Sequence, residues 1–390
     1  MKILRTLSTR RLIVLAIAVL AVAVGGTAIA VAAGGGSGAT PQPKPLAQVI
    51  HDALAAPDSA GITANVRFTN RLFPSGSLLG GNASALMSGA TGRLWLTNDG
   101  RGRLELQSDA GDVQIVWNKD RVTAYDASSN TVYTLNLPAS ATESTSPTNG
   151  AAPSLTQIGD FLSNLGERAD VSAAQPTDIA GRPAYNVRIS PKHDGGLLGS
   201  AELAWDAEQG VPLRVAVYAQ GSSKPVLELA ATDISYGSVP ASAVDVSPPA
   251  GAKTVDLSSA ATPQNGSDKT NAATGLAAVQ AAVDFPVVAP DTLVGLPRKD
   301  VRTVKGNNAL VVYGQGLGAI VVVERKADAT GTQQSGPMSA LPSVSLDGLT
   351  GHELATQLGT AIEWQRNGVS FVLAGSLPPA AAESAARALK

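Results

Sequence analysis

The sequence has no cysteine, and among its 390 residues it has only 3 His, 4 Trp, 6 Tyr and 5 Phe. Without cysteine the chain has no disulfides, thiolate zinc sites, iron–sulfur clusters, cysteine nucleophile or lipid-carrying N-terminal cysteine. By contrast, it contains 40 Gly and 24 Pro. A composition of small, turn-forming and β-branched residues favours short strands joined by turns over a helical bundle.

Basic residues are also scarce outside the N-terminus. Lys2, Arg5, Arg10 and Arg11 are the only charged residues before Lys44, which leaves 25 of the 29 basic residues against 31 acidic residues. The body therefore carries a net charge of −6 and has no basic surface for a phosphate backbone. We expect no nucleic-acid partner.

The N-terminal region is the one long apolar run. Residues 12–33 are uncharged and mostly apolar, and a Gly/Ser/Pro-rich stretch follows at 34–45. About 20 apolar residues suffice to cross a bilayer, and preceding positive charges stay in the cytoplasm. We expect residues 1–34 to be a cytoplasmic n-region and single-pass transmembrane helix, and residues 35–45 to be a tether. The body then lies outside the cytoplasm at the cell membrane.

A cleaved signal peptide is the alternative for the same run. Small-x-small sites occur at residues 28–30 and 30–32, as a signal peptidase requires. Cleavage there predicts a secreted protein, which is also extracytoplasmic.

The body reads as strands with two amphipathic helices. Apolar spacing predicts helices at residues 46–55 and 154–169, the second capped by Ser154 or Thr156. Short turn segments separate the predicted strands, so neighbouring strands are antiparallel. We expect strands at residues 62–68, 93–97, 102–108, 113–117, 121–126, 131–137, 183–189, 200–206, 211–220 and 226–236.

Apolar residues alternate to one side of these strands. Leu94 and Leu96, for example, alternate with Arg93, so one face is apolar and the other meets water. A sheet of about ten such strands with two short helices must curl around them. The predicted fold is mostly β with α: an unclosed antiparallel β half-barrel at residues 46–252, covered by short helices.

A second domain follows a linker. Residues 253–272 are rich in Ser, Thr, Ala, Gly and Pro, as interdomain linkers are. We expect a small α+β domain at residues 273–390. Its predicted helices are residues 275–284, 347–359 and 379–389, and its predicted strands are residues 308–313, 319–325, 361–365 and 370–374.

Four segments carry a resemblance to a known superfamily. They are GRLWLTNDGRGRLEL (92–106), GDVQIVWNKDRVTAYDASSNTVY (111–133), AWDAEQGVPLRV (204–215) and VDVSPPAGA (244–252). In this order they resemble the LolA-like lipoprotein carriers and their RseB- and LppX-like relatives. From Leu276 onward, and above all in EWQRNGVSFVLAGSLPPAAAESAARAL (363–389), the chain is similar to a domain of unknown function often appended to such proteins.

The resemblance implies a hydrophobic cavity that carries or senses acyl chains. Non-directional apolar binding leaves no diagnostic residue, so the candidate positions come from the apolar strand faces and one helix. A plain closed core explains the same residues and stays open as the alternative. The cavity candidates are Leu94, Leu96, Leu104, Leu106, Ile115, Trp117, Phe161, Tyr185, Leu203, Trp205 and Leu213.

A lid is predicted between the first two strands of the body. Residues 72–90 are apolar yet rich in Gly and Ser, as suits a mobile loop over an apolar opening. The lid candidates are Leu72, Phe73, Leu78, Leu79, Leu86 and Met87.

Catalysis has little support in the sequence. His51, His193 and His352 are scattered, and we interpret them as surface residues. There is neither a G-x-S-x-G elbow nor an H-E-x-x-H motif. The Gly-rich residues 314–318 stand between two predicted strands and indicate a hairpin turn, because a nucleotide loop needs a following helix. We expect no enzyme activity, no cofactor and no metal.

These observations lead to hypotheses of different classes. The first is a membrane-anchored cell-envelope protein that binds lipid or lipoprotein acyl chains. The tether and the C-terminal domain suggest the alternative, an envelope-stress sensor or regulatory partner that docks on an anti-sigma factor or another membrane protein. An extracellular hydrolase is a third, for which no nucleophile–base pair is found.

Overall fold

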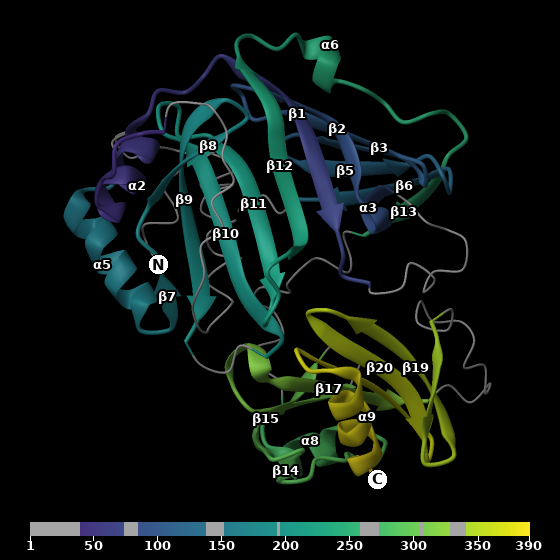
Figure 1. The fold of residues 1–390 in the computed structure, drawn as a ribbon. Helices are drawn as coiled ribbons and strands as arrows, with labels where there is room; N and C mark the ends of the chain where they lie inside the picture. The colour runs from purple at the N-terminus through teal and green to yellow at the C-terminus, as the bar shows by residue number, and fades with distance from the viewer. Residues whose placement is uncertain are drawn as a thin grey trace. The chain divides into compact units, whose positions relative to one another are not determined.

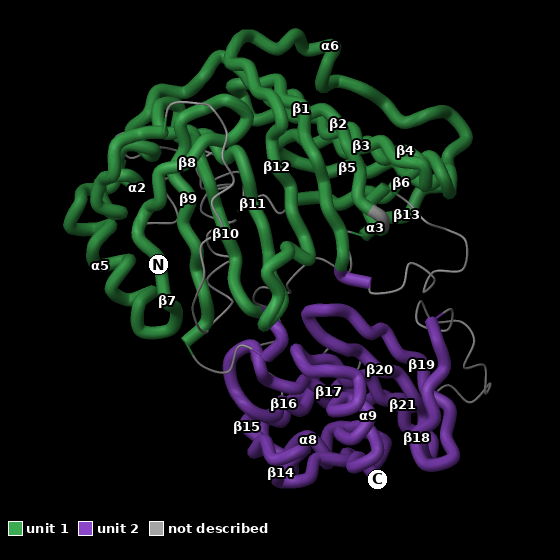
Figure 2. Tube along the Cα trace, in the orientation of Figure 1, with its two compact units in different colours: residues 1–71, 82–192, 199–262 green, residues 72–81, 193–198, 263–390 purple. Residues whose placement is uncertain are grey.

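The computed structural model describes residues 40–73, 85–137, 152–192, 196–257, 273–304, 308–327 and 341–390. The chain divides into two compact units, drawn in different colours in Figure 2. Unit 1 comprises residues 1–71, 82–192 and 199–262, and unit 2 comprises residues 72–81, 193–198 and 263–390. The predicted membrane run lies outside the described residues, and no helix within them is long and apolar enough to span a bilayer.

Unit 1 is built on one large sheet (Figure 1). Its helices are α2 (Leu46–Ala55), α3 (Ala85–Ser88), α5 (Leu155–Gly166) and α6 (Ala241–Val244). Its strands are β1 (Gly61–Asn70), β2 (Ala90–Thr97), β3 (Gly102–Ser108), β4 (Gly111–Trp117), β5 (Arg121–Asp126), β6 (Thr131–Asn136), β7 (Ala169–Val171), β8 (Gln175–Ile179), β9 (Arg182–Pro191), β10 (Leu198–Asp206), β11 (Pro212–Ala219), β12 (Pro225–Tyr236) and β13 (Lys253–Asp256).

The sheet has 13 strands in the order β13-β6-β5-β4-β3-β2-β1-β12-β11-β10-β9-β7, and β8 also pairs with β9. β13 pairs with β6 in parallel, whereas β1 pairs with β2 and β12 antiparallel, as do the successive strands from β2 to β6. The sheet curls into an unclosed half-barrel, as predicted. Three short strands were missed: β7 has three residues, β8 contains Pro176, and β13 lies in the stretch predicted as linker.

One face of this sheet carries α2, α3 and α5, and we call it the inner face. α2 and α5 pack there on β9 and β10, and the half-buried Val215 of β11 joins that cluster. Val215 is paired with Leu229, and Leu229 with Phe68, so the same face continues to β1. There α3 packs through the fully buried Ala85. Helices therefore cover the inner face at β9–β10 and, in part, at β1, β3 and β4.

The two longer helices form where the sequence predicts them. The backbone N–H of Gln157 donates to Ser154 Oγ at 3.3 Å, and the Ser154 N–H donates to Gln157 Oε1 at 2.8 Å. This capping box confirms Ser154 as the cap of α5. His51 of α2 is not a free surface residue, because its Nδ1 lies 2.9 Å from the carbonyl oxygen of Pro153. His51 thus joins α2 to the segment that leads into α5.

The AWDAEQGVPLRV segment forms the β10–β11 turn around Asp206. Asp206 Oδ1 accepts the N–H groups of Glu208 and Gln209 at 2.8 and 3.0 Å. Its Oδ2 accepts from Arg182 Nε and the Tyr236 hydroxyl, both at 2.8 Å. The fully buried carboxylate therefore ties three strands, β9, β10 and β12, to one turn.

Gly210 completes the same turn. Its φ of +63° lies in the left-handed region, and a Cβ atom there would stand 2.2 Å from the carbonyl oxygen of Ala53 in α2. Only glycine meets both demands. The turn and α2 can then lie against each other.

Unit 2 contains a second sheet. Its strands are β14 (Thr292–Leu293), β15 (Leu296–Val304), β16 (Asn308–Tyr313), β17 (Ile320–Lys326), β18 (Ser343–Leu346), β19 (Leu349–Thr356), β20 (Gly359–Arg366) and β21 (Val369–Gly375). They are ordered β14-β15-β16-β17-β21-β20-β19-β18. Its helices are α8 (Leu276–Ala282), α9 (Pro379–Ala388) and a 3-10 turn, η2 (Gly316–Gly318). The Gly-rich residues 314–318 join the antiparallel strands β16 and β17, as the predicted hairpin turn requires.

The predicted helix at residues 347–359 is wrong. Asp347 and Gly348 have φ values of +52° and +85°, which is the two-residue turn that hairpins prefer. Leu346 pairs with Leu349 across it, so β18 and β19 form a hairpin. Asn367 and Gly368 make the equivalent turn between β20 and β21. The Asp-Gly signal outweighs helical apolar spacing here.

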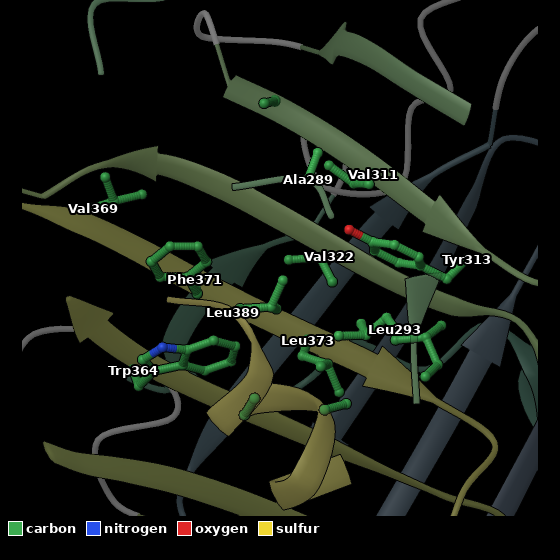
Figure 3. Close-up of a cluster of buried hydrophobic side chains, with 14 of the residues drawn as sticks. Ala289, Leu293, Val311, Tyr313, Val322, Trp364, Val369, Phe371, Leu373 and Leu389 are labelled. Carbon is green, nitrogen blue, oxygen red and sulfur yellow. The ribbon is translucent and has the colours of Figure 1, made fainter. Parts of the chain in front are cut away.

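Both helices of unit 2 bury small side chains against one face of the sheet. Val279 of α8, together with Ala382, Ala385 and Ala386 of α9, belongs to the core cluster. The rings of Trp364 and Phe371 are stacked in it with centroids 5.0 Å apart (Figure 3). Unit 2 thus has a hydrophobic core of its own.

Asp206→Ala is expected to lower the free energy of unfolding of unit 1 by about 3 kcal/mol, because it leaves Arg182 and two turn amides without their acceptor. Burial alone would raise the pKa of Asp206, but the bonds from Arg182, Gln209, Tyr236 and Glu208 hold it below its ordinary value. This stabilisation is present above the ordinary pKa of 3.8 and is lost as pH falls through the lowered one.

Urea unfolding of the full chain measures this change, with hydrogen exchange of β10 peptides assigning the transition to unit 1. Asp109→Asn, in an exposed turn of unit 1, is the control and should change stability by less than about 0.5 kcal/mol. Equal effects of the two substitutions would contradict the role given to Asp206.

Candidate functional site

Ten of the eleven predicted cavity residues stand on strands of the half-barrel, at inner-face positions. Cross-strand pairing joins Leu104 to Leu94 and Ile115, and joins Trp205 to Tyr185. The inner face therefore contains two groups of candidates, which differ in burial.

The first group is closed core. Leu106 is packed with α3, and Tyr185, Leu203 and Trp205 are packed with α2 and α5. These four and Leu213 are each less than 9% exposed. The Tyr185 hydroxyl donates to the carbonyl of Gln42 at 2.5 Å, which holds the segment before α2 against the sheet. These side chains stabilise the fold and are not accessible to a ligand in this structure.

The second group is only half-buried. It comprises Leu94, Leu96, Leu104, Ile115 and Trp117 on β2, β3 and β4. The four-residue α3 contacts β3 and β4, and Leu94, Leu104 and Ile115 lie at the margin of the core cluster that contains its Ala85 together with Leu106 and Val113. The other end of these strands keeps its apolar side chains partly in contact with water.

The half-buried apolar surface continues past β4. Val122 pairs with Trp117, and Ala124 pairs with both Ile115 and Tyr133. Leu135 and Val255 extend the same rows onto β6 and β13. We call the combined set the open apolar face: Leu94, Leu96, Leu104, Ile115, Trp117, Val122, Ala124, Tyr133, Leu135 and Val255.

Sequence reasoning missed the β5, β6 and β13 members of this face. Thr123 and Thr134 occupy the alternate positions of β5 and β6. Threonine occurs on either face of a strand, so the apolar–polar alternation that would mark the inner face is weak there. Val255 lies in the stretch predicted as linker. Only the pairing of β13 with β6 brings it beside Tyr133.

The Trp117 ring lies directly against Gly102. A Cβ atom on Gly102, its cross-strand partner, would stand 2.1 Å from Trp117 Cζ2. The indole therefore occupies the space that any side chain at residue 102 would need. This arrangement places one large aromatic ring within the open apolar face.

Charge is confined to the edge of this surface. Within the described residues, the inner-face positions of β2–β6 and β13 that carry charge are Asp126 and Lys253, which stand at strand ends. Asp126 Oδ1 already accepts the N–H and hydroxyl of Ser128, at 2.9 and 2.7 Å. A surface of this kind binds by burial of apolar area, which is non-directional.

The outer face of the same strands is polar. The Arg103 guanidinium lies 5.1 Å from the ring centroid of Trp95 and also pairs with Glu105. Further along, Arg214 donates to Glu202 at 2.6 Å and to Glu228 at 2.7 Å. Within the described residues, no group of three or more His, Asp or Glu side chains could hold a metal ion.

The predicted lid is replaced in part by packed structure. Leu86 and Met87 lie in α3, where Leu86 packs on the core cluster of Val66 and Val113. This end of the segment is fixed by burial, so Leu86 is a core residue and not part of a mobile loop. Leu72 and Phe73 are half-buried after β1, and Leu78 and Leu79 lie outside the described residues.

Phe161 does not join the inner-face clusters. α5 buries Ile158 and Leu165, whereas Phe161 is 39% exposed and Leu155 is 46% exposed. The apolar spacing predicted the helix correctly but not which of its apolar side chains would be covered. The reason is that α5 contacts only α2 and the short β7 extensively.

Comparisons with known proteins found matches among solved structures. No protein-family model and no curated protein matches the chain. MucB in the MucA/MucB complex of Pseudomonas aeruginosa is 16% identical, with a TM-score of 0.41, over 87% of this chain and 96% of that one. A lipoprotein-sorting protein domain from Vibrio parahaemolyticus is 9% identical, with a TM-score of 0.23, over 51% and 95%.

Both of these matches have identities below 25% and TM-scores below 0.5. TM-scores below 0.5 say nothing of what this chain binds. The chemistry of the site therefore comes from its own side chains.

Gly102→Ala is expected to displace the Trp117 ring, since a methyl group cannot share its space. The free energy of unfolding should fall by about 1–3 kcal/mol, and acrylamide should quench tryptophan emission more strongly. Gly237→Ala is the matched control, because nothing lies within 4 Å of its Cβ position and its φ is not positive. A Gly102→Ala protein with unchanged stability and quenching would show that Trp117 does not lie over Gly102.

Proposed function

We propose that the chain is an extracytoplasmic, membrane-anchored binding protein that holds lipid or lipoprotein acyl chains on the open apolar face of unit 1. The observation that carries the proposal is this face itself. Ten apolar side chains on six strands stay half-buried or exposed, and charged groups stand only at its edge. Large exposed apolar surfaces on a protein mark sites of interaction.

The energetics suit an acyl chain. Each methylene removed from water contributes about 0.8 kcal/mol. A tail of about ten carbons therefore gains several kcal/mol after the costs of ordering it. Such binding needs area and shape but no directed polar group, in agreement with a face that offers none.

The predicted membrane segment would locate this binding activity at the cell membrane. An anchor at residues 1–34 and the tether at residues 35–45 would hold the half-barrel next to the outer leaflet of the cytoplasmic membrane. Lipids and lipoproteins of the cell envelope would then be within reach.

Native mass spectrometry of residues 40–390, purified from a bacterial host without detergent, tests the proposal. We expect a bound species of several hundred daltons that solvent extraction releases and identifies. Ile115→Asp should remove it, because a charge in the middle of the open apolar face cannot be covered by an alkyl chain.

Val116→Asp is the matched control, since Val116 is the next residue of β4, is also half-buried and faces the outer side beside Arg103. It should retain the lipid. Leu104→Asp should behave as Ile115→Asp does. The proposal is contradicted if the Ile115→Asp protein folds and keeps its lipid. It is also contradicted if the wild-type protein binds no lipid after lipid is added back.

A regulatory partner is the second candidate. The observation in its favour is unit 2, which has its own sheet and core and is not needed to form the open apolar face. In this case the chain would dock on a membrane protein through unit 2. Pull-downs from membranes with the full chain and with a chain lacking residues 273–390 separate the candidates: loss of a defined partner with retained lipid favours docking, and equal partners with both chains contradict it.

A further inference from the structure

Unit 2 buries one acidic side chain among the apolar residues of its core. Glu324 of β17 is 0% exposed and lies on the same side of the strand as Ile320 and Val322. Its cross-strand partners are Ala309 and Phe371, both buried. A carboxylate in such surroundings is costly unless it is paired with a cation or fully hydrogen-bonded.

The Glu324 carboxyl is only half satisfied. Its Oε2 accepts the backbone N–H of Val288 at 2.9 Å, and its Oε1 is buried without a hydrogen-bond partner. No cation among the described residues pairs with it, and three basic residues of unit 2 have other partners. These pairs are Lys326–Asp284 at 2.6 Å, Arg325–Glu363 at 2.8 Å and Arg298–Asp291 at 2.8 Å.

Other groups around Glu324 do not supply the missing charge. From β16, Tyr313 presents a buried hydroxyl that also lacks a partner, within the cluster drawn in Figure 3. Burial and the nearby Glu324 both raise the pKa of Tyr313, so it stays neutral. β21 contributes the Phe371 ring, and α8 contributes the uncharged Gln280. Asp291 and Arg298, which also act on Tyr313, are paired with each other.

Val288 belongs to a covering segment, residues 285–291, between α8 and β14. Side chains hold its backbone: Gln280 donates to Phe285 O at 3.0 Å and accepts the N–H of Val287 at 2.8 Å. Arg298 donates to Ala289 O. Phe285 and Ala289 are buried in the same core as Val322. Of the side chains that hold this segment, Glu324 is the one whose charge can change near neutral pH.

We propose that Glu324 is a proton-controlled latch on the covering segment. The neutral carboxyl group holds residues 285–291 closed over β16 and β17. The ionised carboxylate, which pairs with no cation among the described residues, favours an open segment that admits water to it. The latch lies in unit 2 and does not depend on lipid binding by unit 1.

The direction of the pH effect follows from the two states. Burial raises the pKa of Glu324 to about 7, and the Val288 hydrogen bond opposes this only in part. In the open segment the carboxyl returns toward its ordinary value of 4.5. Opening is therefore increasingly favoured as pH rises from 4.5 to about 7, and it changes little above that range.

Hydrogen exchange of the full chain tests the latch through peptides that contain the Val288 amide. After correction for the intrinsic exchange rate, protection of residues 285–291 should fall by more than about tenfold between pH 5 and pH 8. Glu324→Gln should remove this dependence, because glutamine cannot ionise. Glu324→Leu, which fills the space without a polar group, gives the same test if the glutamine variant folds poorly.

Glu363→Gln is the matched control, since Glu363 is in the same sheet, on β20, and pairs with Arg325. It should keep the wild-type pH dependence. The latch is contradicted if wild-type protection is flat between pH 5 and pH 8, or if the Glu324→Gln and Glu324→Leu proteins show the wild-type slope.

Discussion

Water has to be kept from the inner face of a 13-stranded sheet, and the helices of unit 1 are too few and too short to do this everywhere. α2 and α5 cover β9 and β10, and α3 covers part of β1, β3 and β4. Curling of the sheet brings apolar strands toward one another but leaves the far ends of β2–β6 half-buried. The open apolar face results from this shortage of cover, and the proposed binding of acyl chains depends on it.

Polar side chains hold the curled sheet in register from its other side and its ends. Asp206 meets two backbone amides, an arginine and a tyrosine, so its burial is fully compensated. Glu202 is likewise buried but receives Arg188 and Arg214. Both carboxyl groups keep lowered pKa values although burial works against them. These contacts place charge where it supports the strands and leave the inner face apolar.

Unit 2 treats a buried carboxyl group in the opposite way. Within the described part of the chain, Glu324 has one amide donor and no cationic partner, and burial raises its pKa. The contrast with Asp206 shows that burial alone does not fix the sign of a pKa shift, since the number of donors aimed at the carboxyl group decides it. The Asp206 carboxylate, which its donors compensate, stabilises unit 1. The Glu324 carboxyl, which has too few donors, is a point at which unit 2 can respond to pH.

The sequence by itself determined the class of the fold, most of its strands, the two long helices of the half-barrel and the cap at Ser154. These features follow from local alternation, helical spacing and turn chemistry, which short stretches of chain carry. Local signals also misled where two of them competed, as at Asp347-Gly348, where a hairpin turn prevailed over helical spacing.

Only the tertiary structure decided which apolar residues are core and which remain open. Leu104 and Leu106 look alike in sequence, yet Leu106 is a buried member of the cluster around α3 and Leu104 is half-buried at the margin of that cluster. Pairing of β13 with β6 brought Val255 to the same face, and neighbouring strands buried Glu324. Burial depends on what packs against a side chain from distant parts of the chain, and no local pattern contains that information.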